Sequence, residues 1–231
     1  MKKLMEELGI KDIEELFDDI PVKVRRDDFP IPQGKGEMEM EKEINSILQK
    51  NASFFDIPSF IGGGIKPHYI PAAVQHILSR SEFYTSYTPY QAEASQGMLQ
   101  ALFEYQSIVC ELTGMDVANV SMYDAATSLG EAALMAKRIT RKGEFLIPCN
   151  MSWEKKSVLQ NYVRHVGMKV REVGYTDDGK IDISALHKAI NDETAGIYIE
   201  NPNFFGIFER MDELNDIKKN GLLIVGIDPL S

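Results

Sequence analysis

The 231-residue chain has little cysteine, no excess of basic charge and no long apolar run. Its two cysteines, Cys110 and Cys149, lie far apart, which argues against a disulfide framework or a cysteine-based metal site. The net charge of −10 argues against nucleic acid as the main partner. No apolar stretch approaches the roughly 18–20 residues of a membrane helix, and the acidic start does not resemble a signal peptide. We therefore expect a cytoplasmic globular protein that binds neither nucleic acid nor membrane.

Several familiar site patterns are also missing. The three glycines Gly62–Gly64 lead into Ile65-Lys66-Pro67 and not into the Gly-Lys-Ser/Thr ending of a phosphate loop, so we expect them to serve close backbone packing or unusual φ angles. The four histidines lack zinc-ligand spacing, so no metal site is predicted. No nucleophile elbow occurs either. His68, beside Tyr69, is the only histidine that we consider a functional candidate.

An aromatic tract, defined here as Arg80–Gln91 with the sequence RSEFYTSYTPYQ, interleaves four aromatic residues with four hydroxyl residues. The tract has neither helical periodicity nor strand alternation, and Pro89 disfavours a helical conformation at Thr88. One interpretation is a rigid surface that presents many side-chain hydroxyls for hydrogen bonding. The other is a loop whose rings fill a core.

From Thr127 onward, predicted helices alternate with short apolar strands, which is typical of a parallel sheet with helical crossovers. We expect an α/β fold with an N-terminal helical and extended segment at 1–60 and a larger domain at 61–231. Asp12 and Glu15 predict a capping box for a short helix before Pro21, and Ser128 and Glu131 predict one for a later helix that Gly143 closes. The predicted helices are 37–50, 97–112, 128–141, 152–166, 183–190 and 211–220, and the predicted strands are 144–147, 168–173, 196–200 and 222–227.

Polar residues follow three predicted apolar strands at the place where open α/β sheets bind ligands. Asp124–Ser128 joins a strand-like NVSMYD to a helix N-terminus that could hold an anion, although an ordinary helix start is the alternative. Asn201-Pro202-Asn203 follows the predicted strand 196–200, and Asp228 follows the predicted strand 222–227. We therefore expect these groups to share one rim of the sheet.

The chain stops at IDPLS, directly after a strand that looks central. A central strand needs a neighbour, so we expect this to be part of a longer domain, truncated at its C-terminal side. The alternative is a complete small domain with a buried C-terminal strand.

Four stretches, in this order, resemble the glycine decarboxylase (P-protein) family of the glycine cleavage system, in particular subunit 1 of its split bacterial and archaeal form. The matching stretches are IGGGIKPHYIPAAV, RSEFYTSYTPYQAEASQGMLQALFEYQ, LTGMDVANVSMYDAATSLGEAALMA and IENPNFFGIFE. The resemblance covers the chain from about Asp12 to Ser231. It departs from the family at IPCNMSWEKKS, where Ser152 and Trp153 stand in place of the usual His-Pro.

The resemblance implies a pyridoxal phosphate (PLP)-dependent transferase fold of the aspartate aminotransferase type. It also implies that the Schiff-base lysine and the bound PLP belong to subunit 2 of a cytoplasmic heterotetramer, so no catalytic residue is assigned to this chain alone. The residues that match the cofactor side of catalytic relatives are interpreted as remnants, and they are Asp124, Thr127, Ser128, Asn201 and Asp228.

The implied activity is that of glycine dehydrogenase (decarboxylating), an oxidoreductase. It decarboxylates glycine and passes the aminomethyl group to the lipoyl arm of H-protein. A dry cleft with hydroxyl tips suits this reaction, and the candidate cleft residues of this chain are His68, Tyr84, Thr85, Ser86, Tyr87, Tyr90, Gln91 and Glu93. Three alternatives stay open, namely a non-catalytic scaffold for subunit 2, an independent PLP enzyme and an inactive fragment.

Overall fold

The computed structural model describes residues 2–26, 30–214 and 221–230. The chain divides into two compact units, 1–58 and 59–231. The functional domains predicted at 1–60 and 61–231 stay a prediction, because compactness alone assigns no function. Among the described residues, no helix is both long enough and apolar enough to cross a membrane.

In its described residues, the first unit contains three short helical segments. The predicted capping box at Asp12 and Glu15 is confirmed, and it opens a 3-10 helix. None of the three segments contains a buried residue, so this unit has no core of its own among them. The segments are α1 (Lys2–Leu8), η1 (Ile13–Phe17) and α2 (Glu37–Leu48).

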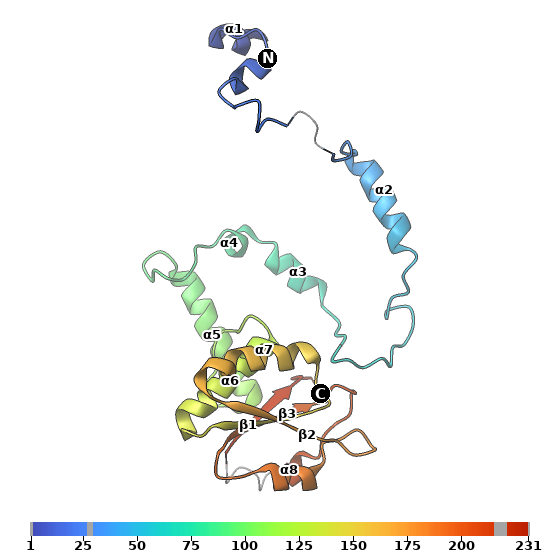
Figure 1. Ribbon diagram of the computed structural model, residues 1–231, viewed down its shortest axis with the longest axis vertical. Helices are drawn as coiled ribbons and strands as arrows, with labels where there is room; N and C mark the ends of the chain where they lie inside the picture. The colour runs from blue at the N-terminus through green and yellow to red at the C-terminus, as the bar shows by residue number, and fades with distance from the viewer. Residues whose placement is uncertain (1, 27–29, 215–220, 231) are drawn as a thin grey trace. The chain divides into compact units, whose positions relative to one another are not determined.

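The second unit contains the predicted parallel sheet. Its strands run in the order β2-β1-β3-β4, and every neighbouring pair is parallel. In Figure 1, α6 and α7 cover one face of the sheet and α8 covers the other. The predicted α/β class is therefore confirmed. The elements are α3 (Ala72–Leu78), α4 (Ser81–Tyr84), α5 (Gln96–Thr113), α6 (Ala125–Thr140), β1 (Glu144–Pro148), α7 (Trp153–Val163), η2 (Arg164–Val166), β2 (Lys169–Val173), α8 (Ile183–Ala189), β3 (Thr194–Asn201) and β4 (Leu222–Ile227).

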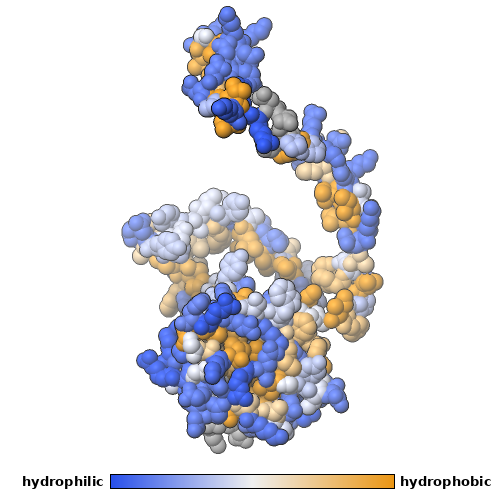
Figure 2. Space-filling model, viewed as in Figure 1, coloured by the Kyte–Doolittle hydropathy of each residue, from blue (hydrophilic) through white to orange (hydrophobic). Residues whose placement is uncertain are grey.

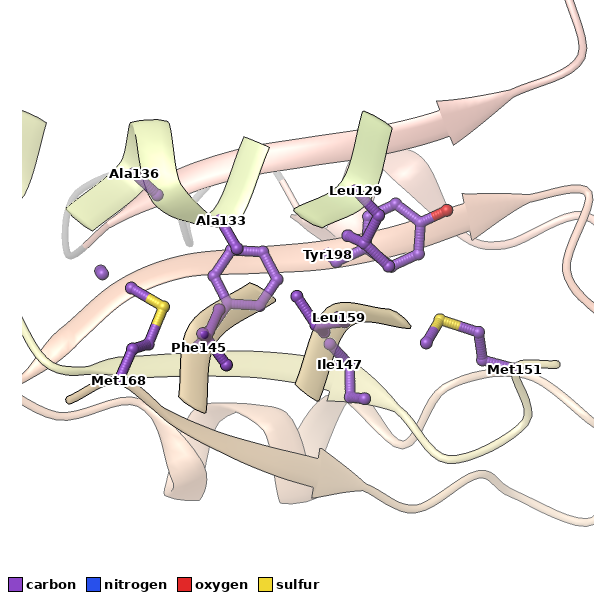
Figure 3. Close-up of a cluster of buried hydrophobic side chains, with 11 residues drawn as sticks. Leu129, Ala133, Ala136, Phe145, Ile147, Met151, Leu159, Met168 and Tyr198 are labelled. Atoms are coloured by element: carbon purple, nitrogen blue, oxygen red, sulfur yellow. The ribbon is translucent and has the colours of Figure 1, made fainter. Parts of the chain in front are cut away.

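The core has two layers because successive side chains of a strand point to opposite faces. Phe145 of β1 and Tyr198 of β3 pack with α6 and α7, as Figure 3 shows, whereas Leu146 and Ile197 belong to the cluster on the α8 side. The central strands β1 and β3 are buried almost throughout, which explains their continuous apolar sequence.

Strand β4 differs from the prediction. Its sequence LLIVGI suggested a central strand covered on both faces. In the described part of the sheet β4 pairs with β3 only, and all its residues are half-buried or exposed.

The start of α6 also corrects the sequence analysis. The capping box is formed by Asp124 and Thr127, one turn before the predicted pair Ser128 and Glu131. The Ser128 hydroxyl donates instead to the Asp124 carbonyl, which is the bond of a residue already inside the helix. The helix ends at Thr140 with Arg141 in the left-handed region at φ 63°, before the predicted stop at Gly143.

Two further predictions need correction or lie outside the described residues. The strand-like NVSMYD is an irregular segment, not a strand. The predicted helix 211–220 falls largely on residues 215–220, which lie outside the described residues.

The C-terminal stop predicted at Gly114 is confirmed, because Gly114 caps α5 with a left-handed φ of 69°.

Candidate functional site

The carboxyl ends of the parallel strands form the candidate site, here called the rim. Asn201 ends β3, and Asp228 follows directly after β4. The Asp228 N–H lies 3.4 Å from the Asn201 carbonyl oxygen, so these two predicted residues are neighbours. The strand-end rule thus placed Asn201 and Asp228 on neighbouring strand ends, and their role as site residues stays a prediction.

His68 joins this rim from a distant part of the sequence. Its Nε2 lies 2.8 Å from Asp228 Oδ2, and the Asp228 side chain is only 8% exposed. The other carboxylate oxygen accepts a bond of 3.1 Å from the Leu230 N–H. The Leu230 N–H, with His68 and Lys66 contributing less, holds the pKa of Asp228 below its ordinary value. Asp228 is therefore an ionised carboxylate that the Leu230 N–H and the His68 ring of the same chain stabilise.

A buried amide network that the sequence analysis missed lies behind Asn201. The side chain of Asn203 donates to the Gly179 carbonyl at 2.9 Å and to Glu209 Oε1 at 2.7 Å. The Glu209 N–H donates to Asn201 Oδ1 at 3.0 Å. Asn203 and Glu209 are 3% and 8% exposed, so these bonds fix the loop after β3 and satisfy its buried polar groups. The second asparagine of Asn-Pro-Asn was the available signal, whereas nothing in the sequence marked Glu209 as buried.

A second missed network joins α7 to the end of β3. The Tyr198 hydroxyl donates to Glu200 Oε1 at 2.9 Å, and Lys155 forms an ion pair with the same oxygen. Burial, followed by the neighbouring Glu200 charge, raises the pKa of Tyr198. Gly226 on β4 leaves room for this hydroxyl, since a Cβ there would lie 2.3 Å from it. The network stabilises α7 against the rim and leaves Lys155 paired.

The N-terminus of α6 uses its candidate residues for capping. The Thr127 N–H donates to Asp124 Oδ1 at 2.7 Å, and the Thr127 hydroxyl lies 2.9 Å from the same oxygen. The Thr127 N–H, followed by its hydroxyl, holds the pKa of Asp124 below its ordinary value. A carboxylate thus occupies the position at which a helix N-terminus would bind an anion.

PLP is the cofactor that the family resemblance implies, and the groups at the rim are already engaged within the chain. A phosphate at the N-terminus of α6 would meet the ionised Asp124 carboxylate, and a pyridine nitrogen would compete with His68 for Asp228. At the rim, Lys155 is paired with Glu200, and Lys156 is paired with Glu172. These residues of the chain do not fit PLP by themselves.

The aromatic tract lies open to solvent. The side chains of Thr85 and Ser86 donate to carbonyls inside the tract, at 2.6 Å to Ser81 and 2.8 Å to Phe83. The Arg80 side chain, through a hydrogen bond, lowers the pKa of Glu82 to about 2. The residues predicted to line the cleft, which are Tyr84, Thr85, Ser86, Tyr87, Tyr90, Gln91 and Glu93, are all exposed. The rings therefore do not fill a core of the described chain, and the structure brings only His68 of the predicted cleft set to the rim.

An apolar groove of about 530 Å³ lies next to the tract. Figure 2 shows hydrophobic surface on the segment that carries α3 and α5. The groove is lined by Ile77, Leu78, Phe83, Met98, Ala101, Leu102, Tyr105, Val120 and Ser121.

Comparison with known proteins assigns the family. The family model of the glycine cleavage system P-protein matches residues 1–231. The probable glycine dehydrogenase (decarboxylating) subunit 1 of Thermococcus kodakarensis is 46% identical over 230 residues, covering 98% of this chain and 51% of the relative. The protein of the same name from Bacillus thuringiensis is 44% identical over 233 residues, covering 100% of this chain and 52% of the relative.

Solved structures agree with this assignment. An inhibitor-bound glycine decarboxylase (P-protein) matches with a TM-score of 0.75 and 32% identity, over 99% of this chain and 51% of that one. A sphingosine-1-phosphate lyase from Burkholderia pseudomallei matches with a TM-score of 0.53 and 14% identity, over 87% of this chain and 49% of that one, and supports the fold alone. The predicted PLP-dependent transferase fold is thus confirmed. The chain spans about half the length of the curated relatives that it matches. It belongs to the glycine cleavage system P-protein family.

Proposed function

We propose that this chain acts as the subunit 1 component of a glycine dehydrogenase (decarboxylating). The observation that carries the proposal is the identity of 46% to a relative of that name over 98% of this chain. The complex would decarboxylate glycine and transfer the aminomethyl group to the lipoyl arm of H-protein. It would work in the cytoplasm as a heterotetramer with subunit 2.

Subunit 2 would hold PLP, which supplies an electron sink when a carboxylate leaves. Two features of this chain support that division of labour. Asp228 is engaged by His68, and the α6 N-terminus is capped by the Asp124 carboxylate. The five predicted remnant residues would then maintain the shape of the rim and would not contact the cofactor.

The contribution of this chain to the reaction would be a wall of the substrate cleft. Tyr84, Tyr87 and Tyr90 are 83%, 56% and 89% exposed, and their hydroxyls make no hydrogen bond to the described residues. Against a partner, the rings would exclude water while the hydroxyls donate to the carboxylate of glycine or line the path of the lipoyl arm. Gln91 and Glu93 would provide polar neighbours, and His68 would lie behind them.

The apolar groove next to the tract supports the need for a partner. A stably folded protein rarely leaves a contiguous apolar patch of this kind without an interaction to cover it. Phe103 and Leu112 on α5 are 69% and 80% exposed. Subunit 2 would cover this surface and place the aromatic tract at the edge of its own active site.

Co-purification with a lysine-bearing subunit 2 tests the proposal. We expect a complex in which PLP gives its lysine-bound absorbance band, with borohydride trapping and peptide mapping placing the label on subunit 2. Glycine decarboxylation should need both chains and lipoylated H-protein. A stoichiometric label on one lysine of this chain alone would refute the division of labour.

A non-catalytic scaffold is the competing function, and the exposure of the tract also suits it. Under that alternative, Tyr87→Phe and Tyr90→Phe weaken assembly or have no effect, while turnover per assembled complex stays the same. Under our proposal, assembly is retained and the KM for glycine or the turnover changes. Titration of subunit 2 with each variant separates the two outcomes.

A further inference from the structure

The triple-glycine segment 61–70 crosses the rim in a conformation that only glycine adopts readily. Gly62, Gly63 and Gly64 have φ angles of 69°, 73° and 77°. Three consecutive left-handed residues would be strained for any residue with a side chain. The sequence therefore specifies a sharp, defined path at this point.

The first attachment of this segment is to the loop after β3. The Gly63 N–H donates to the Phe204 carbonyl at 2.9 Å, and a Cβ on Gly62 would lie 3.2 Å from the same oxygen. Asn203 holds that loop, because its Oδ1 accepts bonds of 3.0 Å and 3.2 Å from the N–H groups of Phe205 and Ile207. The Phe204 carbonyl is thus presented to the glycines by a rigid turn.

The second attachment is the contact of 2.8 Å between His68 and Asp228. The Asp228 carboxylate is nearly buried, at 8% exposure, whereas the His68 ring is 42% exposed. Lys66 lies close enough to contribute to the lowered pKa of Asp228, so the carboxylate faces Lys66 as well as His68 of the segment 61–70. The two attachments, at Gly63 and His68, lie five residues apart, and Gly64 lies between them.

We propose that these two attachments form a clamp that fixes the segment 61–70 to the rim and thereby sets the path of the chain toward the aromatic tract. His68 and Asp228 are positioning residues in this clamp and not catalytic residues. The Asp228 carboxylate, which ends a sheet strand where ligands bind in this fold class, holds a piece of its own chain. The consequence for the substrate cleft rests on the proposed function, whereas the clamp itself is a property of the isolated chain.

Limited proteolysis of the whole chain tests the clamp. Ile61 and Ile65 are 88% and 74% exposed, so the rate at which thermolysin cuts before each, followed by mass spectrometry, reports how firmly the attachments hold the backbone of the segment. We expect His68→Ala and Asp228→Asn each to speed these cuts by about two- to fivefold, the range for a single partly exposed polar contact. The cut before Val24, in the other unit, is the internal reference and should keep its rate.

Three matched variants sharpen the test. His76→Ala removes an exposed histidine of α3 and should change nothing, whereas His68→Gln keeps a hydrogen-bond donor and should retain part of the protection. The double variant His68→Ala with Asp228→Asn should be no faster than either single variant, because both break one contact. Additive effects, or unchanged cutting in His68→Ala, would overturn the proposal.

Nuclear magnetic resonance provides a second readout that does not depend on proteolysis. The imidazole nitrogen shifts of His68 should change in Asp228→Asn, while those of His76 should not. Unchanged His68 shifts would overturn the clamp. Because neither experiment contains subunit 2, PLP or glycine, their failure would leave the proposed function standing, and failure of assembly would leave the clamp standing.

Discussion

Helices α5 and α6 have similar length and amphipathic character, yet they have opposite environments. Helix α6 has 16 residues and buries five of them, whereas α5 has 18 residues and buries none. The apolar face of α6 lies on β1 and β3 and against α7. The apolar residues of α5 have no such layer in the described chain. An amphipathic pattern thus predicts a helix and its apolar face, but the rest of the assembly decides what covers that face.

The largest difference in stability should come from replacing one phenylalanine beneath α6 and one phenylalanine on α5 with alanine. Phe145 is fully buried beneath α6, and Phe103 on α5 is 69% exposed. We expect Phe145→Ala to lower the free energy of unfolding by about 3–5 kcal/mol. Phe103→Ala should change it by less than about 0.5 kcal/mol. Urea unfolding of the isolated chain measures both, and equal losses would contradict the comparison.

A glycine-to-alanine pair should give effects of opposite sign. A Cβ on Gly130 of α6 would lie 2.5 Å from Cγ of Tyr162, whereas a Cβ on Gly97 of α5 would meet nothing within 4 Å. Gly130→Ala should destabilise the fold by about 1–3 kcal/mol, because the Tyr162 ring must move. Gly97→Ala should stabilise it by a few tenths of a kcal/mol, up to about 1, through helix propensity.

Thermal unfolding of the two alanine variants provides the measurement. A destabilising Gly97→Ala would show that α5 packs against something in the isolated chain. A neutral Gly130→Ala would show that α6 and α7 can separate without loss of stability.

The sequence predicted most elements of the sheet because its strands are apolar and its helices end in clear signals. It misplaced the start of α6 because two capping patterns overlap. Ser128-x-x-Glu131 fits the standard box, but Asp124 can cap one turn earlier, and Ala125 and Ala126 favour helix strongly. Local pattern alone does not rank two adjacent caps.

The candidate site could be predicted in part. The rule for strand ends found Asn201 and Asp228, because parallel strands place their carboxyl ends together. The contact between His68 and Asp228 joins residues 160 positions apart and leaves no local signal. The burial of Glu209 likewise depends on how the loop after β3 folds back. Tertiary partners of this kind are visible only in the structure.

The cap of α6 should add a pH-dependent difference between the two helices, smaller than the core effects. The pKa of Asp124 lies below its ordinary value of 3.8. The carboxylate therefore stabilises the folded state fully above the unfolded value, and this stabilisation is lost as the pH falls through the folded value. Asp124→Asn keeps a capping side chain but removes the titration. We expect its unfolding midpoint to fall less steeply than that of the native chain below about pH 4, and parallel curves would contradict this.

The smallest effect on folding should come from substitutions in the aromatic tract, because its side chains are exposed. These substitutions should instead affect the activity of the complex. Tyr87→Phe and Tyr90→Phe each remove one hydroxyl that makes no bond to the described residues, so the stability of the isolated chain should change by less than about 0.5 kcal/mol. Tyr123→Phe, at 94% exposure and outside the tract, is the matched control.

In the complex with subunit 2, the tract variants should raise the KM for glycine or lower the turnover while Tyr123→Phe does neither. If all three variants match the native complex in both constants, the tract is not a wall of the substrate cleft, because a hydroxyl that contacts the substrate or lipoyl arm cannot be removed without cost.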